Sequence, residues 1–342
     1  MSLSGGLNTA RRALRLYRSN GSARAWIQAA RHIALRATGR AAPPFFTISP
    51  TYRCPLRCAH CGVAAPRGTA AAELSTAGIR SVIDDARRIG ALQVTFSGGD
   101  PLMRDDLDEL LRYAHDRGLL TRINTSGYLL TRERAAQLRA AGLTQGCVSI
   151  DDVDPAEHDR LRGRPGAYDR AVRALGFLAE EGIPRQIITY ADRRQITGGL
   201  EAIIRLGRRL DVMSVYILLP TAIGRWEGDY SRVLTAAEKS RVRSLQNPTF
   251  VHMELTDERA ACAATNGMVF FVSAFGDITP CPFVPYSFGN VRTVSVARAW
   301  RAHARERPAV CRGECAMNDP AARAGLKAHV ERVAATIGSP PI

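Results

Sequence analysis

The sequence predicts an α/β fold, in which a partial (βα)6 barrel with parallel strands is followed by a small cysteine-rich α+β domain. Between residues 45 and 219, short runs rich in β-branched and aromatic residues alternate with longer helical patterns. This alternation is typical of consecutive βα units and a parallel sheet. Six such units without a return to eight indicate an open barrel. Beyond residue 246 the pattern changes to a segment that holds four of the eight cysteines, so a second domain is expected there.

Six segments are predicted to form the strands, each bounded by turn residues and followed by a helical pattern. They are Phe45–Ser49, Gln93–Ser97, Leu119–Asn124, Cys147–Asp151, Gln186–Tyr190 and Val212–Leu219. The intervening helices include Thr76–Ile89 and Asp105–Arg117, which end at Gly90 and Gly118 because glycine readily adopts the conformation that closes a helix. Groups that carry chemistry are expected at the carboxyl ends of the strands.

Three regions are predicted along the chain. They are a basic helical extension over residues 1–44, the barrel over residues 45–246 and the cysteine-rich domain over residues 247–342. The extension contains apolar periodicity that indicates short helices at Ala10–Tyr17 and Ala23–Ala37. A helix over Thr235–Gln246 ends the barrel, and the last domain begins with a hairpin of Met268–Ala274 and Ile278–Pro282.

The basic excess is concentrated at the amino terminus. The chain has 47 Lys and Arg against 32 Asp and Glu, and residues 1–72 contain 11 arginines but no acidic residue. Such a segment can bind nucleic acid, anionic lipid or an acidic partner. No aromatic platform or nucleic-acid motif accompanies it, so we interpret it as a solvated basic face. We expect neither nucleic-acid binding nor stable membrane insertion.

Composition and cysteine spacing indicate a soluble protein of a reducing compartment. The chain is 46% apolar and 23% charged, as in globular proteins, and no apolar run reaches the roughly 18 residues that span a bilayer. Seven of the eight cysteines fall into two groups with metal-ligand spacing. Because clustered thiols persist where disulfides do not form, a cytoplasmic location is predicted.

Three cysteines follow the first predicted strand within one short segment. Cys54, Cys58 and Cys61 lie in the run CPLRCAHC, a spacing that lets one loop wrap around one metal centre. A structural zinc site takes four ligands, and so does a 4Fe–4S cluster used only for electron transfer. Three thiolates leave one iron open for an external ligand, so the pattern indicates catalysis. Zinc or redox-active thiols are the alternatives.

This spacing, placed directly after a first strand, resembles the signature of the radical S-adenosylmethionine (radical SAM) superfamily. The resemblance implies a catalytic 4Fe–4S cluster on Cys54, Cys58 and Cys61. Its open iron would hold S-adenosylmethionine, which is cleaved to a 5′-deoxyadenosyl radical that abstracts hydrogen from a substrate. It also implies an external one-electron reductant of the flavodoxin or ferredoxin type. His60 stands where the family often has an aromatic residue, and we expect it near the adenine.

Polar segments at the other strand ends resemble the family's cofactor contacts. Ser97-Gly98-Gly99-Asp100-Pro101 is similar to its Gly-Gly-Glu-Pro motif, which implies that Asp100 accepts from the cofactor's ammonium group. Ser149 and Asp151 are expected to share one strand face by alternation. Helix caps and surface ion pairs are the alternative roles for these residues. The residues predicted to bind the cofactor are His60, Ser97, Gly98, Gly99, Asp100, Asn124, Ser126, Ser149, Asp151, Arg162 and Leu218.

The carboxyl-terminal region contains a second set of four cysteines, Cys262, Cys281, Cys311 and Cys315. Four thiolates complete either a tetrahedral zinc site or an iron–sulfur cube, and the residues alone do not separate the two. Behind a barrel of this kind the set resembles the SPASM extension and its shorter form, Twitch. A full SPASM domain uses more cysteines for two clusters, so the resemblance implies the Twitch form with one auxiliary 4Fe–4S cluster for electron transfer.

An auxiliary cluster near a substrate radical favours removal of a second electron. We therefore predict two-electron oxidation of a small natural product, such as a sugar or aminocyclitol. Radical epimerisation, peptide maturation or crosslinking is the alternative, and a non-catalytic iron–sulfur carrier or sensor is a third possibility. The residues predicted as candidate bases, by position at strand ends only, are Asp151, Asp152, Tyr190 and Asp192. Cys147, outside both cysteine sets, is predicted to face the barrel interior as packing, or to return hydrogen in an epimerase.

Overall fold

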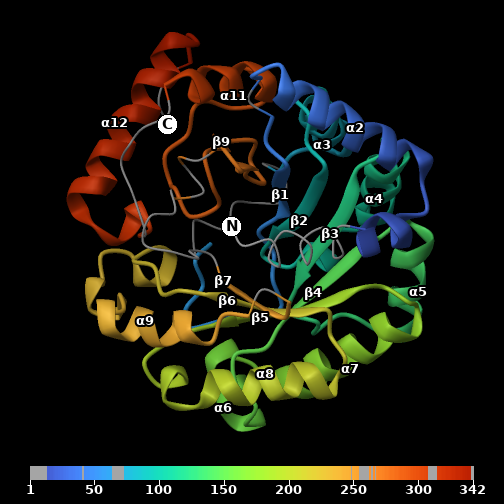
Figure 1. Cartoon of the computed structure of the whole chain (residues 1–342), viewed down its shortest axis with the longest axis vertical. Helices are drawn as coiled ribbons and strands as arrows, with labels where there is room; N and C mark the ends of the chain where they lie inside the picture. The colour runs from blue at the N-terminus through green and yellow to red at the C-terminus, as the bar shows by residue number, and fades with distance from the viewer. Residues whose placement is uncertain are drawn as a thin grey trace.

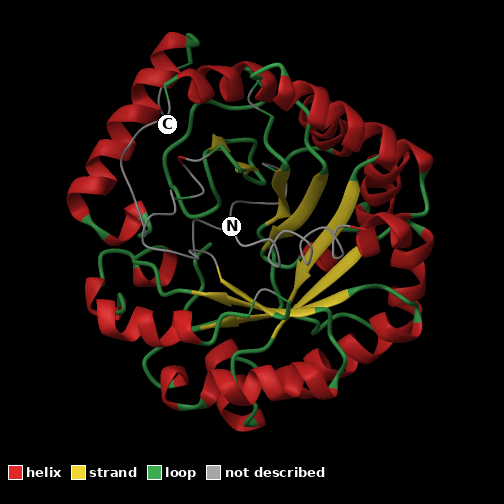
Figure 2. Cartoon of the chain, viewed as in Figure 1, coloured by secondary structure: helices red, strands yellow, loops and turns green. Residues whose placement is uncertain are grey.

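The structure is a computed structural model that describes residues 14–40, 42–63, 73–247, 249–253, 262, 265, 267–306 and 314–339. Its centre is one sheet of nine strands in the order β7-β6-β5-β4-β3-β2-β1-β8-β9. Figures 1 and 2 show this sheet as a curved surface with helices along its outside. The predicted α/β class with a parallel, partial barrel is confirmed.

Each of the six predicted strands is present, and each lies within a few residues of its expected bounds. They are β1 Phe45–Thr51, β2 Gln93–Gly98, β3 Leu120–Thr125, β4 Gln145–Ser149, β5 Arg185–Tyr190 and β6 Ser214–Leu218. Neighbouring members of this set all pair in parallel. Because β4 ends at Ser149, Asp151 lies in the following loop, and the prediction that both share a strand face is wrong.

The helices that follow strands β1 to β6 along the chain cover the outer face of the sheet. They are α3 Thr76–Arg88, α4 Leu107–Asp116, α5 Arg132–Ala140, α6 Pro155–Arg162, α7 Ala167–Glu180, α8 Gly199–Arg209 and α9 Ala236–Ser244. Ile123, Val148 and Ile187 are fully buried in the core beneath them. Since side chains alternate along a strand, their neighbours Arg122 and Cys147 lie on the inner, concave face.

Three further strands extend the sheet at both edges. They are β7 Val251–Met253, β8 Val269–Val272 and β9 Ile278–Thr279. The predicted hairpin is confirmed as the antiparallel pair β8–β9, but β8 also pairs in parallel with β1, which the sequence pattern did not indicate. The sheet is therefore continuous across the expected boundary at residues 246–247. Two helices without a predicted counterpart, α11 Val296–Arg305 and α12 Pro320–Thr336, follow.

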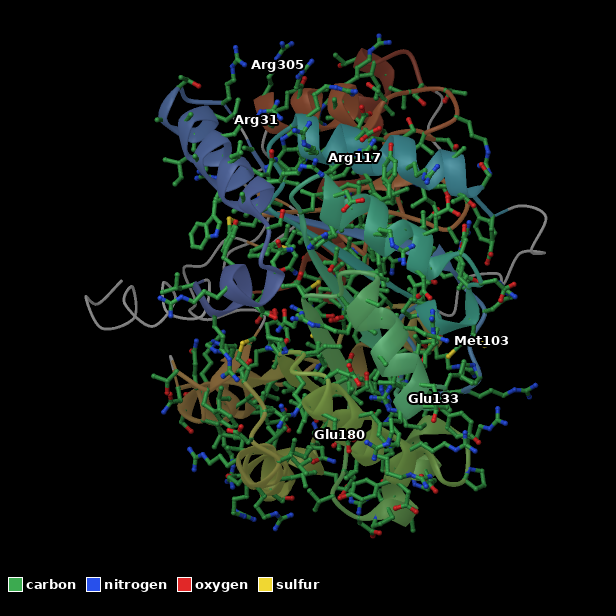
Figure 3. All side chains as sticks on the ribbon, turned by 90° about the vertical axis from the view of Figure 1, so that its right-hand side faces the viewer. Arg31, Met103, Arg117, Glu133, Glu180 and Arg305 are labelled. Carbon is green, nitrogen blue, oxygen red and sulfur yellow. The ribbon has the colours of Figure 1, made fainter. Side chains whose placement is uncertain are left out.

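The basic extension packs against the amino end of the barrel. Its predicted second helix is confirmed as α2 Ala23–Ala37; residues 14–20 are also helical, and the rest of the first predicted helix lies outside the described residues. Gln28 donates to the carbonyl oxygens of Arg87 and Ala91, and His32 Nδ1 lies 2.7 Å from the Gly90 carbonyl oxygen. In Figure 3, Arg117 at the end of α4 lies nearer to α2 than Met103 does, which precedes α4.

Candidate active site

The three-cysteine loop leaves β1 at the carboxyl edge of the sheet. Cys54, Cys58 and Cys61 are all partly buried, and the amide of Leu56 lies 3.5 Å from the Cys54 sulfur as a donor. Two backbone hydrogen bonds join this loop to the end of α6, from Ala59 to the Leu161 carbonyl at 2.8 Å and from Arg57 to the Arg162 carbonyl at 3.1 Å. The loop is therefore held as part of the fold.

Glycines from three other loops touch the backbone of the cysteine loop. A Cβ at Gly99 would overlap the Arg53 carbonyl, one at Gly163 the Arg57 carbonyl and one at Gly224 the Cys61 carbonyl. Gly163 and Gly224 also have positive φ angles, which side chains disfavour. Gly98 and Gly99 were predicted as cofactor contacts. In the structure they also allow the backbone just before Cys54 to pack closely against the end of β2. The role of the other two glycines was missed, because no local motif marks them.

An ion-paired group lies beside the cysteine loop. Asp151, in the loop after β4, is buried, with Arg162 Nε at 2.8 Å and His60 Nε2 at 3.2 Å from its Oδ2 atom. Although burial opposes ionisation, Arg162, His60 and His158 lower the pKa of Asp151 below its ordinary value. Burial also lowers the pKa of His60, so Arg162 is the permanent cation of the group. Arg162 Nη1 lies 3.7 Å from the Cys58 sulfur.

His60 belongs to an aromatic group that the sequence motifs did not reveal. Its ring stacks on Tyr190, with centroids 4.9 Å apart, and Trp226 lies 6.1 Å from His60 and 5.5 Å from Tyr190. Leu218 ends β6 beside Tyr190 in the sheet register. The structure therefore brings His60 and Leu218 to one region, together with the aromatic rings of Tyr190 at the end of β5 and Trp226 in the loop after β6.

Asp100 links the ends of β2 and β3. Its fully buried carboxylate accepts from the hydroxyl of Thr125 at 2.9 Å, the hydroxyl of Ser126 at 2.6 Å, and the amides of Ser126 and Leu102. Burial nevertheless raises the pKa of this carboxyl. These contacts engage both carboxylate oxygens within the chain, so Asp100 orients Ser126. The predicted ammonium contact would have to share these same oxygens.

The remaining predicted residues face the concave side with a polar network that was not predicted. Asn124 Nδ2 lies 3.5 Å from the Ser97 hydroxyl, and Arg122 donates to Asn124 and, at 2.9 Å, to Gln186. Ser149 is partly exposed at the end of β4. Arg122 is a half-buried cation, and no described carboxylate pairs with it. Arg122 lies inside a strand and belongs to no sequence motif. Only the alternation of side chains along the strand indicates that it faces the concave side.

The candidate bases are all engaged by neighbours. Asp152 accepts from Gln195 Nε2 at 3.1 Å, and Asp192 accepts from the Gln195 amide at 2.8 Å. The Tyr190 hydroxyl accepts from the Thr221 amide at 3.1 Å. With Asp151 ion-paired, each of the four holds a loop in place in this structure.

One loop after β6 contacts both cysteine-bearing regions. The amide of Arg225 donates to the Cys61 carbonyl at 3.0 Å. Three residues earlier in the same loop, the Ala222 amide donates to the Asn318 side-chain oxygen at 2.9 Å, and the Asn318 side-chain nitrogen donates to the Pro220 carbonyl at 3.0 Å. Asn318 ends the short helix that begins directly after Cys315. We call residues 220–226 the bridging loop.

The second cysteine set is described only in part. Cys262 and Cys281 are buried and Cys315 is partly buried, whereas Cys311 lies outside the described residues. Among the described side chains, no three His, Cys, Asp or Glu residues gather closely enough to hold a single metal ion. The thiolates of an iron–sulfur cube bind separate irons, so this observation does not oppose a cluster.

The first cysteine set fits a metal cluster chemically. Burial, together with the neighbouring Asp100, Cys58 and Cys61, raises the pKa of the Cys54 thiol to about 12, although the Leu56 amide acts in the opposite direction. A thiol whose ionisation is opposed in this way becomes a thiolate when a cation binds it, and iron supplies that charge. A partial barrel with a loop of three cysteines at its carboxyl edge is the arrangement expected of an enzyme of radical chemistry.

Comparison with known proteins gives the family. Residues 48–192 match the model of the radical SAM superfamily, and residues 262–320 match the SPASM iron–sulfur cluster-binding domain. The chain is 31% identical over 282 residues to the AdoMet-dependent heme synthase of Nitratidesulfovibrio vulgaris, covering 73% of this chain and 77% of that protein. The heme synthase of Methanosarcina barkeri is 29% identical, with 76% and 82% covered. The chain belongs to the radical SAM superfamily and carries a carboxyl-terminal SPASM domain.

Solved structures share the fold. Native anSMEcpe with bound AdoMet superposes with a TM-score of 0.63 at 14% identity, covering 86% of this chain and 97% of that one. Streptococcus suis SuiB bound to the precursor peptide SuiA gives 0.60 at 16% identity, with 87% and 70% covered. At these identities the likeness extends to the fold alone. In the described part of this chain, every helix is too short or too polar to traverse a membrane.

Proposed function

We propose that this enzyme carries out a two-electron oxidation of a carboxylate-bearing substrate held on the concave face of its sheet. The observation that carries the oxidation is the bridging loop, which contacts Cys61 through Arg225 and the Cys315 segment through Asn318. When bound, S-adenosylmethionine and the two iron–sulfur groups supply abstraction of one hydrogen atom and uptake of one further electron, which with loss of a proton completes the oxidation. Because one short loop contacts both cysteine-bearing regions, electron exchange between their iron–sulfur groups is favoured.

The chain's own residues hold and orient these groups. We propose that Cys54, Cys58 and Cys61 bind the catalytic 4Fe–4S cluster and that Cys262, Cys281, Cys311 and Cys315 bind the auxiliary one. Arg162 stands beside the Cys58 sulfur, where its guanidinium favours a carboxylate such as that of the cofactor. His60, Tyr190 and Trp226 form aromatic walls suited to an adenine ring.

The substrate class follows from Arg122. A half-buried arginine on the concave face, bonded to the neutral side chains of Asn124 and Gln186, favours an anion as its counter-charge. The relatives named above are heme synthases, and heme carries carboxylates. Nothing among them supports the sugar or aminocyclitol expected from the sequence, so we place carboxylated tetrapyrroles first among candidate substrates.

The test is product identification with the reduced, iron-loaded enzyme. Carboxylated tetrapyrroles, sugars and aminocyclitols are supplied in turn, and the product is read by mass. Loss of two hydrogens from a tetrapyrrole supports the proposal, whereas consumption of a neutral sugar alone contradicts the substrate class. A product of unchanged mass would favour epimerisation. Arg122→Gln should raise the substrate KM about tenfold or more, because removing a charged partner costs roughly 1.5–3 kcal/mol.

The electron route needs a separate experiment. Replacing Cys262, Cys281, Cys311 and Cys315 by alanine should lower bound iron from about eight to about four per chain, keep cleavage of S-adenosylmethionine and stop product formation. Cys147→Ala serves as the matched control and should keep about eight irons. Zinc in place of the second set of irons, or full product formation by the four-cysteine variant, would contradict the oxidation route.

A further inference from the structure

The outer face of α2 is apolar, although its inner face makes the polar contacts. Gln28 and His32 point to the barrel and are buried, whereas Trp26, Ile27 and Ile33 are 47%, 66% and 67% exposed. Ala30 and Ala34 on the same side of the helix are exposed too. This is the reverse of a surface helix, which normally buries its apolar stripe. Contiguous exposed apolar surface of this kind marks an interaction site.

This face is surrounded by positive charge. Between residues 14 and 40 stand six arginines and no acidic residue, at positions 15, 18, 24, 31, 36 and 40. Within the described chain none of the six is paired with a carboxylate; Arg24 and Arg31 donate to backbone carbonyls at the ends of α4 and α3. Their charge is therefore available to an external anion.

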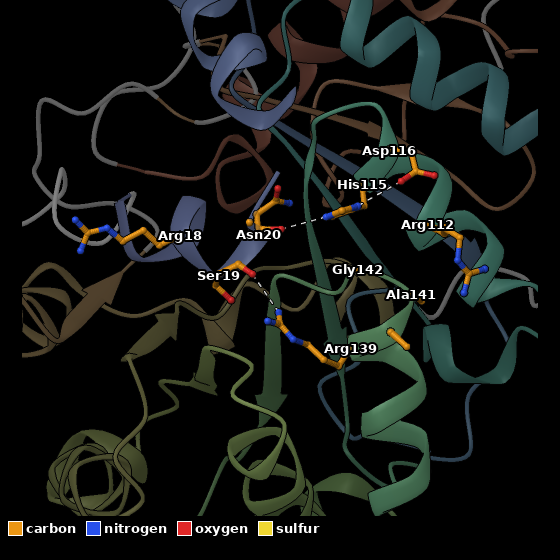
Figure 4. A pocket seen from close by; sticks show the side chains of 11 residues that line it. Arg18, Ser19, Asn20, Arg112, His115, Asp116, Arg139, Ala141 and Gly142 are labelled. Atoms are coloured by element: carbon orange, nitrogen blue, oxygen red, sulfur yellow. Dashed lines mark hydrogen bonds and ion pairs between the residues drawn. The ribbon is translucent and has the colours of Figure 1, made fainter. Parts of the chain in front are cut away.

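A cationic cavity adjoins the start of the same helix. Its volume is about 480 Å³, and Asn20 and Gly21, which precede Ser22 at the start of α2, form part of its wall. Arg18, Arg112 and Arg139 line it from three separate helices, against a single carboxylate, Asp116. Figure 4 shows Arg139 reaching the Ser19 carbonyl across the cavity, so the segment before α2 is fixed to the barrel.

We propose that the amino end of the barrel docks on the surface of an anionic lipid bilayer. Trp26, Ile27 and Ile33 would lie in the interfacial layer, and the surrounding arginines would face the headgroups. A tryptophan with aliphatic neighbours on one helix face, flanked by arginines, is suited to that layer. A second copy of the chain would bring two arginine-rich segments together, so self-association is opposed by charge. The site is remote from the cysteine loop, which leaves the carboxyl end open to cofactor, substrate and reductant.

The experiment is co-sedimentation of the full-length, iron-loaded enzyme with vesicles of phosphatidylcholine alone or with one third phosphatidylglycerol. Three proteins are compared with the wild type: Trp26→Ser/Ile27→Ser/Ile33→Ser, Arg15→Gln/Arg18→Gln/Arg36→Gln, and the control Arg173→Gln/Arg205→Gln. The control removes exposed arginines of α7 and α8. Iron content and S-adenosylmethionine cleavage, expected to be unchanged in all three, show that each variant is folded.

We expect the wild type and the control to bind the anionic vesicles, to ignore phosphatidylcholine alone and to be released by salt. Each lost arginine of the extension should weaken binding about fivefold, and the apolar variant should not sediment. No binding to anionic vesicles, equal binding to both vesicle types, or undiminished binding by the apolar variant would overturn the proposal. So would a wild-type dimer that dissociates in the apolar variant, since a second copy would then cover the face.

Discussion

The two ends of the barrel use arginine in opposite ways. At the carboxyl end, Arg162 is buried against Asp151 and lies beside the Cys58 sulfur. At the amino end, Arg24 and Arg31 donate to carbonyls that end the surrounding helices, where cations are favoured. The first end is arranged around groups that the chain itself does not contain, whereas Arg24 and Arg31 at the second end bond to the backbone of the chain itself. Substitutions within these contacts should therefore affect activity at the carboxyl end and stability at the amino end.

The largest difference between the effect on activity and the effect on stability is expected in the cysteine loop. Cys54→Ala, Cys58→Ala or Cys61→Ala should abolish reductive cleavage of S-adenosylmethionine, because each removes a predicted cluster ligand. The free energy of unfolding of the metal-free protein should change by less than about 1 kcal/mol, since these thiols are only partly buried. Cleavage assays and denaturant unfolding of the same proteins measure both. If a variant still cleaved S-adenosylmethionine, the assignment of these three cysteines to the catalytic cluster would be wrong.

Two glycines of similar backbone conformation, one in the bridging loop and one just after it, allow a paired test. Gly224 and Gly228 both have positive φ, but only at Gly224 would a Cβ overlap the Cys61 carbonyl. Gly228→Ala should cost about 1–2 kcal/mol of stability and leave activity intact. Gly224→Ala should cost at least that much and also lower iron retention and cleavage about tenfold or more. Equal behaviour of the two variants would show that the bridging loop does not position Cys61.

On the inner face of α2, which packs against the barrel, the effects should be on stability alone. Gln28→Ala removes the donor to the Arg87 and Ala91 carbonyls, and His32→Ala removes the contact to Gly90. Each should lower the free energy of unfolding by about 1–3 kcal/mol, because a buried polar group is left without its partner. The rate of S-adenosylmethionine cleavage per folded molecule should not change, as every cofactor motif begins at Cys54. A fall in that rate would contradict the prediction that these amino-end contacts affect stability and not activity.

The smallest effect is expected at Cys147. Its fully buried thiol lies 3.5 Å from the Gln186 side-chain oxygen on the concave face, so Cys147→Ala should cost about 1 kcal/mol in stability and keep turnover. A folded variant that still cleaves the cofactor but forms no product would instead indicate that the thiol returns hydrogen. Solvent deuterium appearing at carbon in the wild-type product would give the same answer, and epimerisation would replace oxidation.

Local patterns predicted the parts of the fold that local chemistry determines. The six strands and the helices that end before Gly90 and Gly118 carry their signals within a few residues, so the sequence predicted them. The pairing of β8 with β1 was not, because partners far apart in sequence share no local mark. Arg122 and Gly224 were missed for the same reason: each gains its importance from a residue on another strand or loop. The role of Trp226 was also not predicted, because only the folded chain places its ring beside His60.

The position of β1 inside the sheet has a consequence for the order of assembly. Phe45 at its start is registered with Gln93 of β2 on one side and Val269 of β8 on the other. During synthesis β1 can pair with β2 early, but its second edge stays open until β8 leaves the ribosome. An open edge invites pairing with other chains. The strand that leads into the cysteine loop is thus completed late, which favours metal loading of the finished chain over loading of the nascent one.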